Sequence, residues 1–458
     1  MLPFNLKAKI NFFKFLTIKL PKSDIYPHYI LPEKFSRHDI MELWKIYAKK
    51  VKYRQIYKNL GIFIKIPFCQ SKCFYCQCFS KIERNPLIID RYVDYICKEL
   101  ESYASIMKGI KIDSLYFGGG TPSILTISQI RRIFNTFYNN FKLEVDSQIN
   151  FEATPHSLDE EKIKVLKELG VNRLTLGVQS LDEKVLDINS RNLQTGKMVK
   201  EIVALIKKYK IDSLNIDLIG GLYGQSYQSF MDSLKKVIAL NPEVLHIYPF
   251  SAAEETLFSK SGKKLSAKDL KLRRSMIEAG NKLILKSGYK EIKNDSYGKA
   301  EKGRNKQEAD SAEVNASILA LGDRALGHIF EELIYMVEES KGKKYAQGVK
   351  IDLEDEITKY LLNNLRNTIN LDELFRVFPS YTLKDLKKKL GYLLLFKKII
   401  WQGNNMISRI KSRREQLVYG KFLYKKSYLE KLFKFCKNEF DPNLDYSKKL
   451  DYLIDETQ

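Results

Sequence analysis

Cysteine is scarce in this chain and unevenly placed. Only six cysteines occur among 458 residues, and four of them fall within the ten residues that end at Cys78. A structural zinc site usually takes its four ligands from two separated pairs, and this sequence has no second pair. Cys97 and Cys436 stand singly in helix-like stretches, where we expect buried thiols. Structural zinc and a disulfide framework are therefore disfavoured.

Long uncharged apolar segments are also missing. No stretch of the sequence is long enough and apolar enough to span a membrane. Near the amino end, Lys14 and Lys19 interrupt every apolar stretch, and no small-residue cleavage site follows. A signal peptide is therefore not expected, and we expect no secretion.

Acidic residues fall short of basic ones, with 55 Asp and Glu against 78 Lys and Arg, which gives a formal net charge of +23. The excess is spread along the chain rather than gathered in one stripe, so nucleic-acid binding is disfavoured. A basic leader and a lysine-aromatic tail would suit peripheral contact with an anionic membrane, although lysines that snorkel over packed aromatics are the simpler interpretation. Positive charge would also attract an anionic substrate.

The four clustered cysteines contain the spacing CxxxCxxC at Cys69, Cys73 and Cys76. Thiolates are soft ligands that hold iron–sulfur clusters, and a loop this short brings three sulfurs to three corners of one cluster. The fourth iron then has no protein ligand. As at catalytic zinc, an open position lets the metal bind and activate a small molecule. The spacing predicts a 4Fe–4S cluster with one open iron.

Further motifs follow in a fixed order. Cys78 extends the pattern to CxxxCxxCxC, and the glycine-rich segment Tyr-Phe-Gly-Gly-Gly-Thr-Pro-Ser begins at Tyr116. The segments 150–155, 177–180 and 215–222 come next. In this order the motifs resemble the radical SAM enzymes, which use S-adenosylmethionine (SAM), and in particular the branch of oxygen-independent coproporphyrinogen III oxidase.

The resemblance implies a SAM site and the residues that form it. Carboxylates can accept hydrogen bonds from an ammonium group and from ribose hydroxyls, a guanidinium can pair with a carboxylate, and glycines let the backbone approach a ligand. One SAM molecule is implied, and a second is an open alternative. The implied cofactor-binding residues are Phe63, Phe74, Tyr75, Cys78, Gly119, Gly120, Thr121, Glu152, Gln179, Arg191, Asp217 and Ser251.

Four positions depart from the family pattern. Phe63 stands where the family usually has a SAM-contacting tyrosine, and Lys65 stands where it has a histidine. Tyr223 replaces a proline after Gly-Leu. The segment Gly322-Asp323-Arg324-Ala325 carries charges where relatives have small neutral residues. These changes leave SAM binding plausible and leave the choice of substrate open.

Apolar, strand-like runs alternate with helical patterns, which is typical of repeated βα units. The strand-like runs are 62–66, 113–117, 148–153, 173–178, 212–219 and 244–249. The helical stretches lie near 88–107, 126–139, 159–169, 196–209 and 226–239. Six such units fit the α/β fold that the resemblance implies, an incomplete (β/α)6 barrel, although spacing alone does not exclude a full barrel.

The remaining segments differ in character from the barrel. We expect a basic extension over 1–60, the barrel over 61–260, a connector and barrel extension over 261–345, a winged-helix-like domain over 346–410 and a helical tail over 411–458. Comparable leaders in the family lie over the active site. The polar stretch 299–306 is expected to be a mobile surface loop.

Three functions share the predicted core. The first is oxidative decarboxylation of a substrate propionate to a vinyl group, with an anionic tetrapyrrole as substrate. The second is radical SAM methylation of an aromatic or quinone-like acceptor. The third is a haem chaperone, whose HNxxYW motif is missing here because no histidine occurs between His246 and His328. A flavodoxin or ferredoxin would supply electrons, and we expect a monomer in a reducing cytoplasm.

Overall fold

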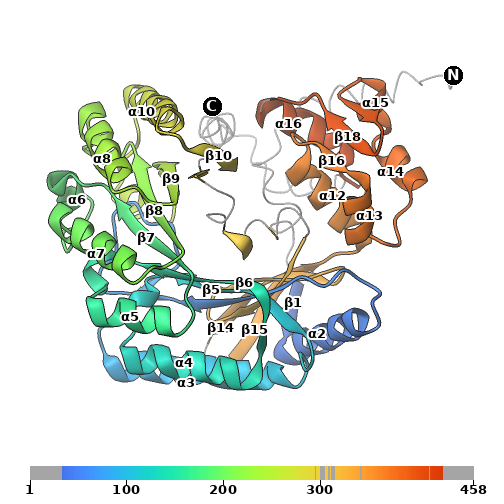
Figure 1. Ribbon diagram of the computed structural model, residues 1–458, viewed down its shortest axis with the longest axis horizontal. Helices are drawn as coiled ribbons and strands as arrows, with labels where there is room; N and C mark the ends of the chain where they lie inside the picture. Colours follow the sequence, from blue (N-terminus) through green and yellow to red (C-terminus); the bar gives the residue numbers. More distant parts are fainter. Residues whose placement is uncertain are drawn as a thin grey trace.

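The computed structural model describes residues 33–293, 296–299, 305–307, 310, 315–340, 343–411 and 413–425. One sheet of 13 strands organises most of these residues (Figure 1). Its order is β1-β15-β14-β13-β12-β2-β5-β6-β7-β8-β9-β11-β10. Within the described ranges, no helix is both long and apolar enough to cross a bilayer.

Six consecutive strands in the middle of the sheet run parallel to one another. They are β2 (Leu60–Ile66), β5 (Lys111–Gly119), β6 (Lys142–Ala153), β7 (Arg173–Gln179), β8 (Ser213–Gly220) and β9 (Val244–Pro249). These strands coincide with the six predicted runs to within a few residues at most ends. The predicted α/β class, with a parallel sheet and covering helices, is confirmed.

Helices alternate with these strands and lie on the outer side of the sheet in Figure 1. They are α3 (Pro86–Ala104), α4 (Ile127–Asn140), α5 (Glu160–Glu168), α6 (Glu183–Ile188), α7 (Gly196–Lys208) and α8 (Tyr227–Ala239). Helix α6 is short and was not predicted. One face of these strands is apolar and packs in the core beneath the helices, whereas the other face carries polar residues such as Thr175 and Asn215. In β2, for example, Ile62, Ile64 and Ile66 are all fully buried.

Additional strands widen the sheet at both edges. Beside β2 lies β12 (Ser317–Leu321), which is parallel to it, followed by the antiparallel strands β13 (Leu326–Ile329), β14 (Leu333–Ser340), β15 (Lys343–Lys350) and β1 (Glu33–Ser36). Beside β9 lie the antiparallel strands β11 (Ser296–Gly298) and β10 (Lys290–Lys293). The segment interpreted as a connector, 261–345, thus contributes six strands in whole or part.

Seven further elements complete this part of the chain as the structure describes it. They are α2 (Arg37–Lys52), β3 (Phe68–Cys69), β4 (Lys81–Ile82), α9 (Leu257–Lys260), α10 (Ala267–Lys286) and the 3-10 turns η1 (Pro122–Ile124) and η2 (Pro155–Ser157). Helix α2 packs on the widened edge, where Trp44 Nε1 donates to Tyr335 Oη at 3.1 Å. Residues 1–32 of the predicted extension 1–60, and most of the predicted loop 299–306, lie outside the described residues; the rest of the extension forms β1, α2 and the start of β2.

The carboxyl-terminal part forms a group of helices with a small sheet, at upper right in Figure 1. Its elements are α12 (Leu353–Asn364), β16 (Ile369–Asn370), α13 (Leu371–Val377), α14 (Leu383–Lys389), α15 (Gly391–Leu395), β17 (Ile399–Gln402), β18 (Asn405–Ser408), α16 (Arg413–Gly420) and η4 (Lys421–Leu423). The order β16-β18-β17, with helices before the final hairpin, is a winged-helix-like arrangement. The rest of the predicted tail, 426–458, lies outside the described residues.

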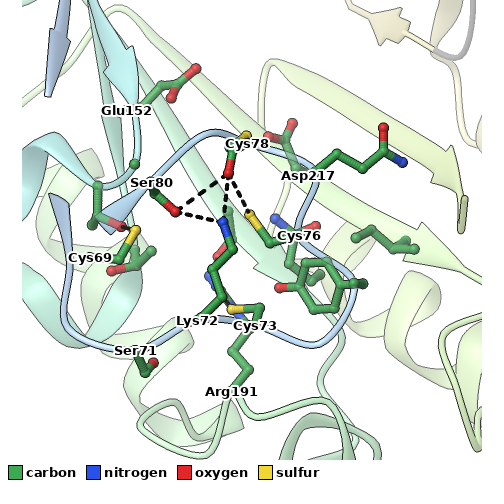
Figure 2. A pocket seen from close by; sticks show the side chains of 18 of the residues that line it. Cys69, Ser71, Lys72, Cys73, Cys76, Cys78, Ser80, Glu152, Arg191 and Asp217 are labelled. Carbon is green, nitrogen blue, oxygen red and sulfur yellow. Dashed lines mark hydrogen bonds between the residues drawn. The ribbon is translucent and has the colours of Figure 1, made fainter. Parts of the chain in front are cut away.

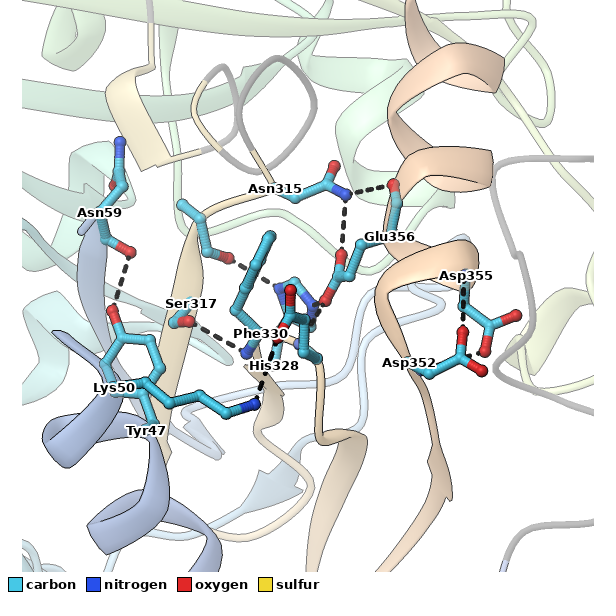
Figure 3. A network of polar contacts seen from close by, with 12 residues as sticks. Tyr47, Lys50, Asn59, Asn315, Ser317, His328, Phe330, Asp352, Asp355 and Glu356 are labelled. Carbon is cyan, nitrogen blue, oxygen red and sulfur yellow. Dashed lines mark hydrogen bonds and ion pairs between the residues drawn. The ribbon is translucent and has the colours of Figure 1, made fainter. Parts of the chain in front are cut away.

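A buried polar network joins this group to the sheet (Figure 3). His328 Nδ1 lies 2.8 Å from the carbonyl oxygen of Ala316, and its Nε2 lies 2.7 Å from Glu356 Oε1. Both neighbouring atoms are oxygen acceptors, so these contacts suit a protonated ring that donates from both nitrogens. Asn315 Nδ2 donates to Glu356 Oε2 at 2.7 Å. Burial alone would raise the pKa of Glu356, but the facing His328 charge holds it below its usual value.

We expect Glu356→Gln to lower the free energy of unfolding by about 3 kcal/mol, because it leaves the protonated His328 ring buried without a counter-charge. Urea denaturation at neutral pH measures the change. The control is Glu373→Gln, which removes an exposed carboxylate 3.6 Å from Arg376 and should cost less than about 1 kcal/mol. Equal losses in the two variants would contradict the assignment of an ion pair at this junction.

Candidate functional site

A cavity of about 590 Å³ opens at the carboxyl ends of the parallel strands. The cysteine-containing segment 69–80, called here the cysteine loop, forms one wall of it. Residues at the ends of β5 to β9 form the opposite wall. Figure 2 shows Cys69, Cys73 and Cys76 with the side chain of Lys72 among them, Glu152 and Asp217 above, and Arg191 below.

Strand ends place most of the predicted site residues in this cavity. Because the strands are parallel, their carboxyl ends meet at one edge of the sheet. Ten of the predicted cofactor-binding residues line the cavity: Tyr75, Cys78, Gly119, Gly120, Thr121, Glu152, Gln179, Arg191, Asp217 and Ser251. The three predicted metal ligands, Cys69, Cys73 and Cys76, line it too.

Phe63 and Phe74 are not among the residues that line the cavity. Phe63 packs edge-on against Tyr116, with 5.7 Å between the ring centroids. Phe74 packs against Phe258, with 5.6 Å between centroids. Both rings therefore make packing contacts, and Tyr116, the ring beside Phe63, donates to the lining residue Glu152.

The three thiols have different polar surroundings. Cys69 Sγ lies 3.3 Å from Thr121 Oγ1, and burial raises the pKa of this thiol. Arg191 Nη1 donates to Cys73 Sγ at 3.6 Å. The pKa of Cys76 is lowered, first by a hydrogen bond from the Cys78 thiol and then by the positive charge of Lys72. Cationic neighbours of this kind favour thiolates, the form that binds metal.

Lys72 also holds the cysteine loop in shape. Its ammonium donates to the carbonyl oxygen of Cys78 at 2.6 Å and to Ser80 Oγ at 2.9 Å (Figure 2). Across the part of the chain that the structure describes, no three His, Cys, Asp or Glu side chains are close enough to share one metal ion. Ligands of a cluster bind different irons and need only face one shared space. The three thiols around the cavity meet that requirement.

Several buried polar atoms at the cavity have no protein partner. Gln179 Oε1, Arg191 Nε and His156 Nδ1 are buried without a hydrogen bond. All three residues line the cavity. Gln179 also has a backbone φ of +67°, a strained conformation for a non-glycine residue that the surrounding structure must hold in place. Unpaired buried groups are costly, so they fit a polar ligand that completes their hydrogen bonds.

Two carboxylates face the cavity in different environments. Glu152 accepts from Tyr116 Oη at 2.6 Å and from the Gly119 amide at 3.2 Å, and its burial raises its pKa to about 7. Asp217 Oδ1 accepts from Asn215 Nδ2 at 2.7 Å and lies 3.3 Å from His246 Nδ1. A cationic or hydroxyl-bearing ligand would stabilise the ionised form of Glu152.

Among the lining residues that sequence reasoning missed are Lys72, His156, Tyr248 and Arg273. His156 directly follows the motif 150–155 and could have been included with it. Tyr248 Oη lies 2.7 Å from His246 Nδ1, two residues earlier in β9, and the period-2 spacing of the predicted strand 244–249 could have paired them. Arg273 comes from α10, donates to the carbonyl oxygen of Phe250 and packs across Gly221. No motif or residue spacing in the sequence predicts that Arg273 reaches the cavity.

Gly120 permits the close approach of the cysteine loop. A Cβ atom there would lie 2.5 Å from the carbonyl oxygen of Phe68 and 2.9 Å from its amide nitrogen. The Gly120 amide donates to the carbonyl oxygen of Ile66 at 2.8 Å, and the Thr121 amide donates to that of Phe68 at 2.9 Å. The glycine segment thus holds the residue just before Cys69 against the end of β5.

Comparison with known proteins adds independent findings. Residues 63–237 match the model of the radical SAM superfamily. The chain is 29% identical over 241 residues to the haem chaperone HemW of Buchnera aphidicola subsp. Acyrthosiphon pisum, which covers 52% of this chain and 63% of that protein. It is 31% identical over 193 residues to the oxygen-independent coproporphyrinogen III oxidase of Synechocystis sp., covering 42% and 41% of the two chains.

The oxygen-independent coproporphyrinogen III oxidase of Escherichia coli is 26% identical over 359 residues, which covers 72% of this chain and 78% of that protein. The solved structure of coproporphyrinogen III oxidase from Escherichia coli superposes with a TM-score of 0.69 at 20% identity and covers 90% of this chain and 97% of that one. This likeness establishes the fold. Matches to the first two relatives span less than two thirds of their lengths.

We expect Gly120→Ala to displace the cysteine loop, because the added methyl group meets backbone rather than a flexible side chain. The free energy of unfolding should fall by about 2 kcal/mol, and the iron bound after anaerobic reconstitution should fall with it. The control is Gly391→Ala, where nothing lies within 4 Å of the added Cβ. A Gly120→Ala protein with full iron content and unchanged stability would contradict this role.

We expect Glu152→Gln to stabilise the SAM-free protein at about pH 8. The pKa of Glu152 rises from 4.5 to about 7 on folding, so ionisation costs stability as pH rises through this window. The amide avoids that cost, which is on the order of 3 kcal/mol above about pH 7 and absent below about pH 4.5. Urea denaturation at the two pH values measures the difference. Exposed Glu161→Gln is the control, and a gain that did not depend on pH would refute the explanation.

Proposed function

We propose that this chain is a radical SAM protein, in which Cys69, Cys73 and Cys76 hold a 4Fe–4S cluster and SAM binds in the adjoining cavity; the match of residues 63–237 to the superfamily model supports this. The observation that carries this proposal is that the three thiols share one cavity with the polar strand-end residues. A reducing cytoplasm would keep these thiols available for iron.

The bound cluster and SAM would together supply one-electron chemistry that can take a hydrogen atom from an unreactive carbon. The residues of this chain would bind and orient SAM and would shield the reacting carbon from water. Arg191 offers a planar guanidinium to the SAM carboxylate, and Glu152 and Asp217 accept from its ammonium and ribose hydroxyls. Gln179 Oε1, which has no hydrogen-bond partner in the protein, would accept a hydrogen bond from SAM. The apolar strand core behind these residues excludes water from the reacting carbon.

The reaction that we propose is oxidative decarboxylation of a coproporphyrinogen-like substrate. A propionate side chain loses a hydrogen atom and carbon dioxide, becomes a vinyl group, and passes its remaining electron to an acceptor. Supporting this choice are the oxidase relatives and the extent of the fold match to the Escherichia coli enzyme. A flavodoxin or ferredoxin would deliver the electron that begins each turnover.

A haem-handling role is the second candidate, because relatives of similar identity are named haem chaperones. His328, the isolated histidine that could have served as a haem ligand, has both ring nitrogens engaged by Ala316 and Glu356. Haem ligation there would have to break a buried ion pair, which favours the oxidase.

The test is anaerobic reconstitution with iron and sulfide, reduction, and mass spectrometry of the products with and without coproporphyrinogen III. Deoxyadenosine together with loss of mass from the porphyrinogen supports the oxidase. Deoxyadenosine without porphyrinogen turnover refutes the oxidase and points to methylation. Binding of haem without any SAM cleavage would favour the chaperone.

We expect Cys73→Ala to lose cluster iron and at least about 100-fold of SAM cleavage, because one corner of the cluster loses its thiolate. Iron and sulfide analysis and deoxyadenosine formation measure these effects. Cys97→Ala is the matched control, since this buried thiol lies in α3 away from the cavity lining and should retain both. Full iron and normal cleavage in Cys73→Ala would refute the ligand assignment.

A further inference from the structure

We propose that Lys65, Lys81 and Arg324 form a binding site for a substrate carboxylate at the edge of the cavity. This inference deepens the proposed function and rests on it. The three cations surround the ring of Phe79, and we call the four residues the Phe79 cluster. Two of its cations occupy positions where the sequence departs from the family pattern, Lys65 in place of histidine and Arg324 in a segment that is usually neutral.

One aromatic ring gathers all three charges. The ammonium of Lys65 lies 5.7 Å from the Phe79 centroid, that of Lys81 lies 5.6 Å from it, and the Arg324 guanidinium carbon lies 4.8 Å from it. These distances are within the range of cation–π attraction. The ring therefore offsets part of the repulsion between like charges and keeps the three donors together.

The cluster stands on rigid backbone at the ends of β2 and β12. Tyr92 Oη donates to the carbonyl oxygen of Lys65 at 2.7 Å and accepts from the Asp323 amide at 3.2 Å. Gly322 has a φ of +103°, and a Cβ atom there would lie 2.4 Å from that same Tyr92 oxygen. Lys65 Nζ donates to the carbonyl oxygen of Arg324 at 2.9 Å. Two neighbouring strand ends are thus locked to each other.

Positive charge remains in excess after the internal pairs are counted. Asp323 is 7% exposed and pairs with Lys81 at 3.0 Å, and Glu338 lies 3.9 Å from Arg324. Lys65 makes no ion pair with any residue that the structure describes. The side chains of Lys81 and Arg324 are 57% and 44% exposed, so their donors can reach a ligand. Three cations face two carboxylates, and the other carboxyl that acts on Lys65 among the described residues, Glu152, has its pKa raised to about 7 by burial, so the cluster can take a further anion.

Arg324 carries a second indication of function. Its backbone φ is +57°, in the left-handed region that favours glycine. Holding a long side chain in this conformation costs about 1 kcal/mol or more, and such strain persists mainly where the side chain has a use. A guanidinium fork matches the two oxygens of a carboxylate, which a lysine alone does not.

The cluster borders the cavity through its own sequence neighbours. Phe79 lies between Cys78 and Ser80, and both of these residues line the cavity. A substrate whose reacting arm enters the cavity could therefore place another acidic arm on the cluster. A tetrapyrrole that bears four propionates has acidic arms to spare, and the Phe79 ring would contact their methylene carbons.

Equilibrium binding of coproporphyrin III, a stable tetracarboxylate, to the reconstituted protein tests the proposal through quenching of porphyrin fluorescence. The variants are Lys65→Met, which keeps the aliphatic stem, Arg324→Gly, which suits the positive φ, and the double variant. The matched control is the double variant Lys164→Met/Lys200→Met, which removes two exposed lysines from α5 and α7. The tetramethyl ester of the porphyrin is the uncharged probe.

We expect the double variant to bind coproporphyrin III about tenfold more weakly, with a shallower salt dependence, while the control binds as the wild type does. Binding of the tetramethyl ester should be unchanged, and the melting temperature of Arg324→Gly should not fall. Equal loss for the ester, equal loss in the control, or no loss in the double variant would each overturn the proposal.

Formation of deoxyadenosine from SAM without porphyrin separates this proposal from the one on which it rests. Failure of the wild type to cleave SAM would refute the proposed function but leave the binding measurement valid. Normal cleavage in the double variant, combined with weakened porphyrin binding, supports a role in substrate recognition. Normal cleavage with unchanged binding overturns the carboxylate site alone.

Discussion

Parallel pairing of β2 with β5, and of each strand onward to β9, is the constraint on which the rest of the structure depends. It brings every strand end to one edge, so residues from distant parts of the chain meet there without any local sequence relation. The cysteine loop follows the first of these strands and is held against the end of the second by backbone hydrogen bonds. Position in the sheet thus determines which side chains can reach one ligand.

Charge at this edge is arranged in two zones. Around the thiols, Arg191 and Lys72 favour anionic sulfur, while deeper in the cavity buried Glu152 holds a proton more readily than a free carboxyl does. The first zone suits iron and the second suits a cationic ligand that would displace the proton. Both charge environments are present before a ligand binds, because the sheet fixes the strand ends that carry most of these residues.

The sequence contained enough information for the barrel strands and for most of the cavity lining. Alternating apolar runs such as 173–178 can be recognised as strands from the sequence alone. The order of the motifs then located Glu152, Gln179 and Arg191. Strands β14 and β15 were missed because they contain many polar residues and are recognisable as strands only from their pairing with each other and with β1. The positions of Phe63 and Arg273 could not be predicted either, because both depend on packing between distant segments. Phe63 packs against Tyr116 of β5, and Arg273 reaches the cavity from α10.

The ion pair between His328 and Glu356 bears on how this chain can be divided. Glu356 belongs to α12, whereas His328 belongs to β13, whose neighbour β12 pairs directly with the strand that leads into the cysteine loop. A truncation before residue 353 would strip His328 and Asn315 of their buried partner next to that strand. The winged-helix-like region is therefore not a detachable module, and the barrel expressed without it would be a damaged protein rather than a minimal one.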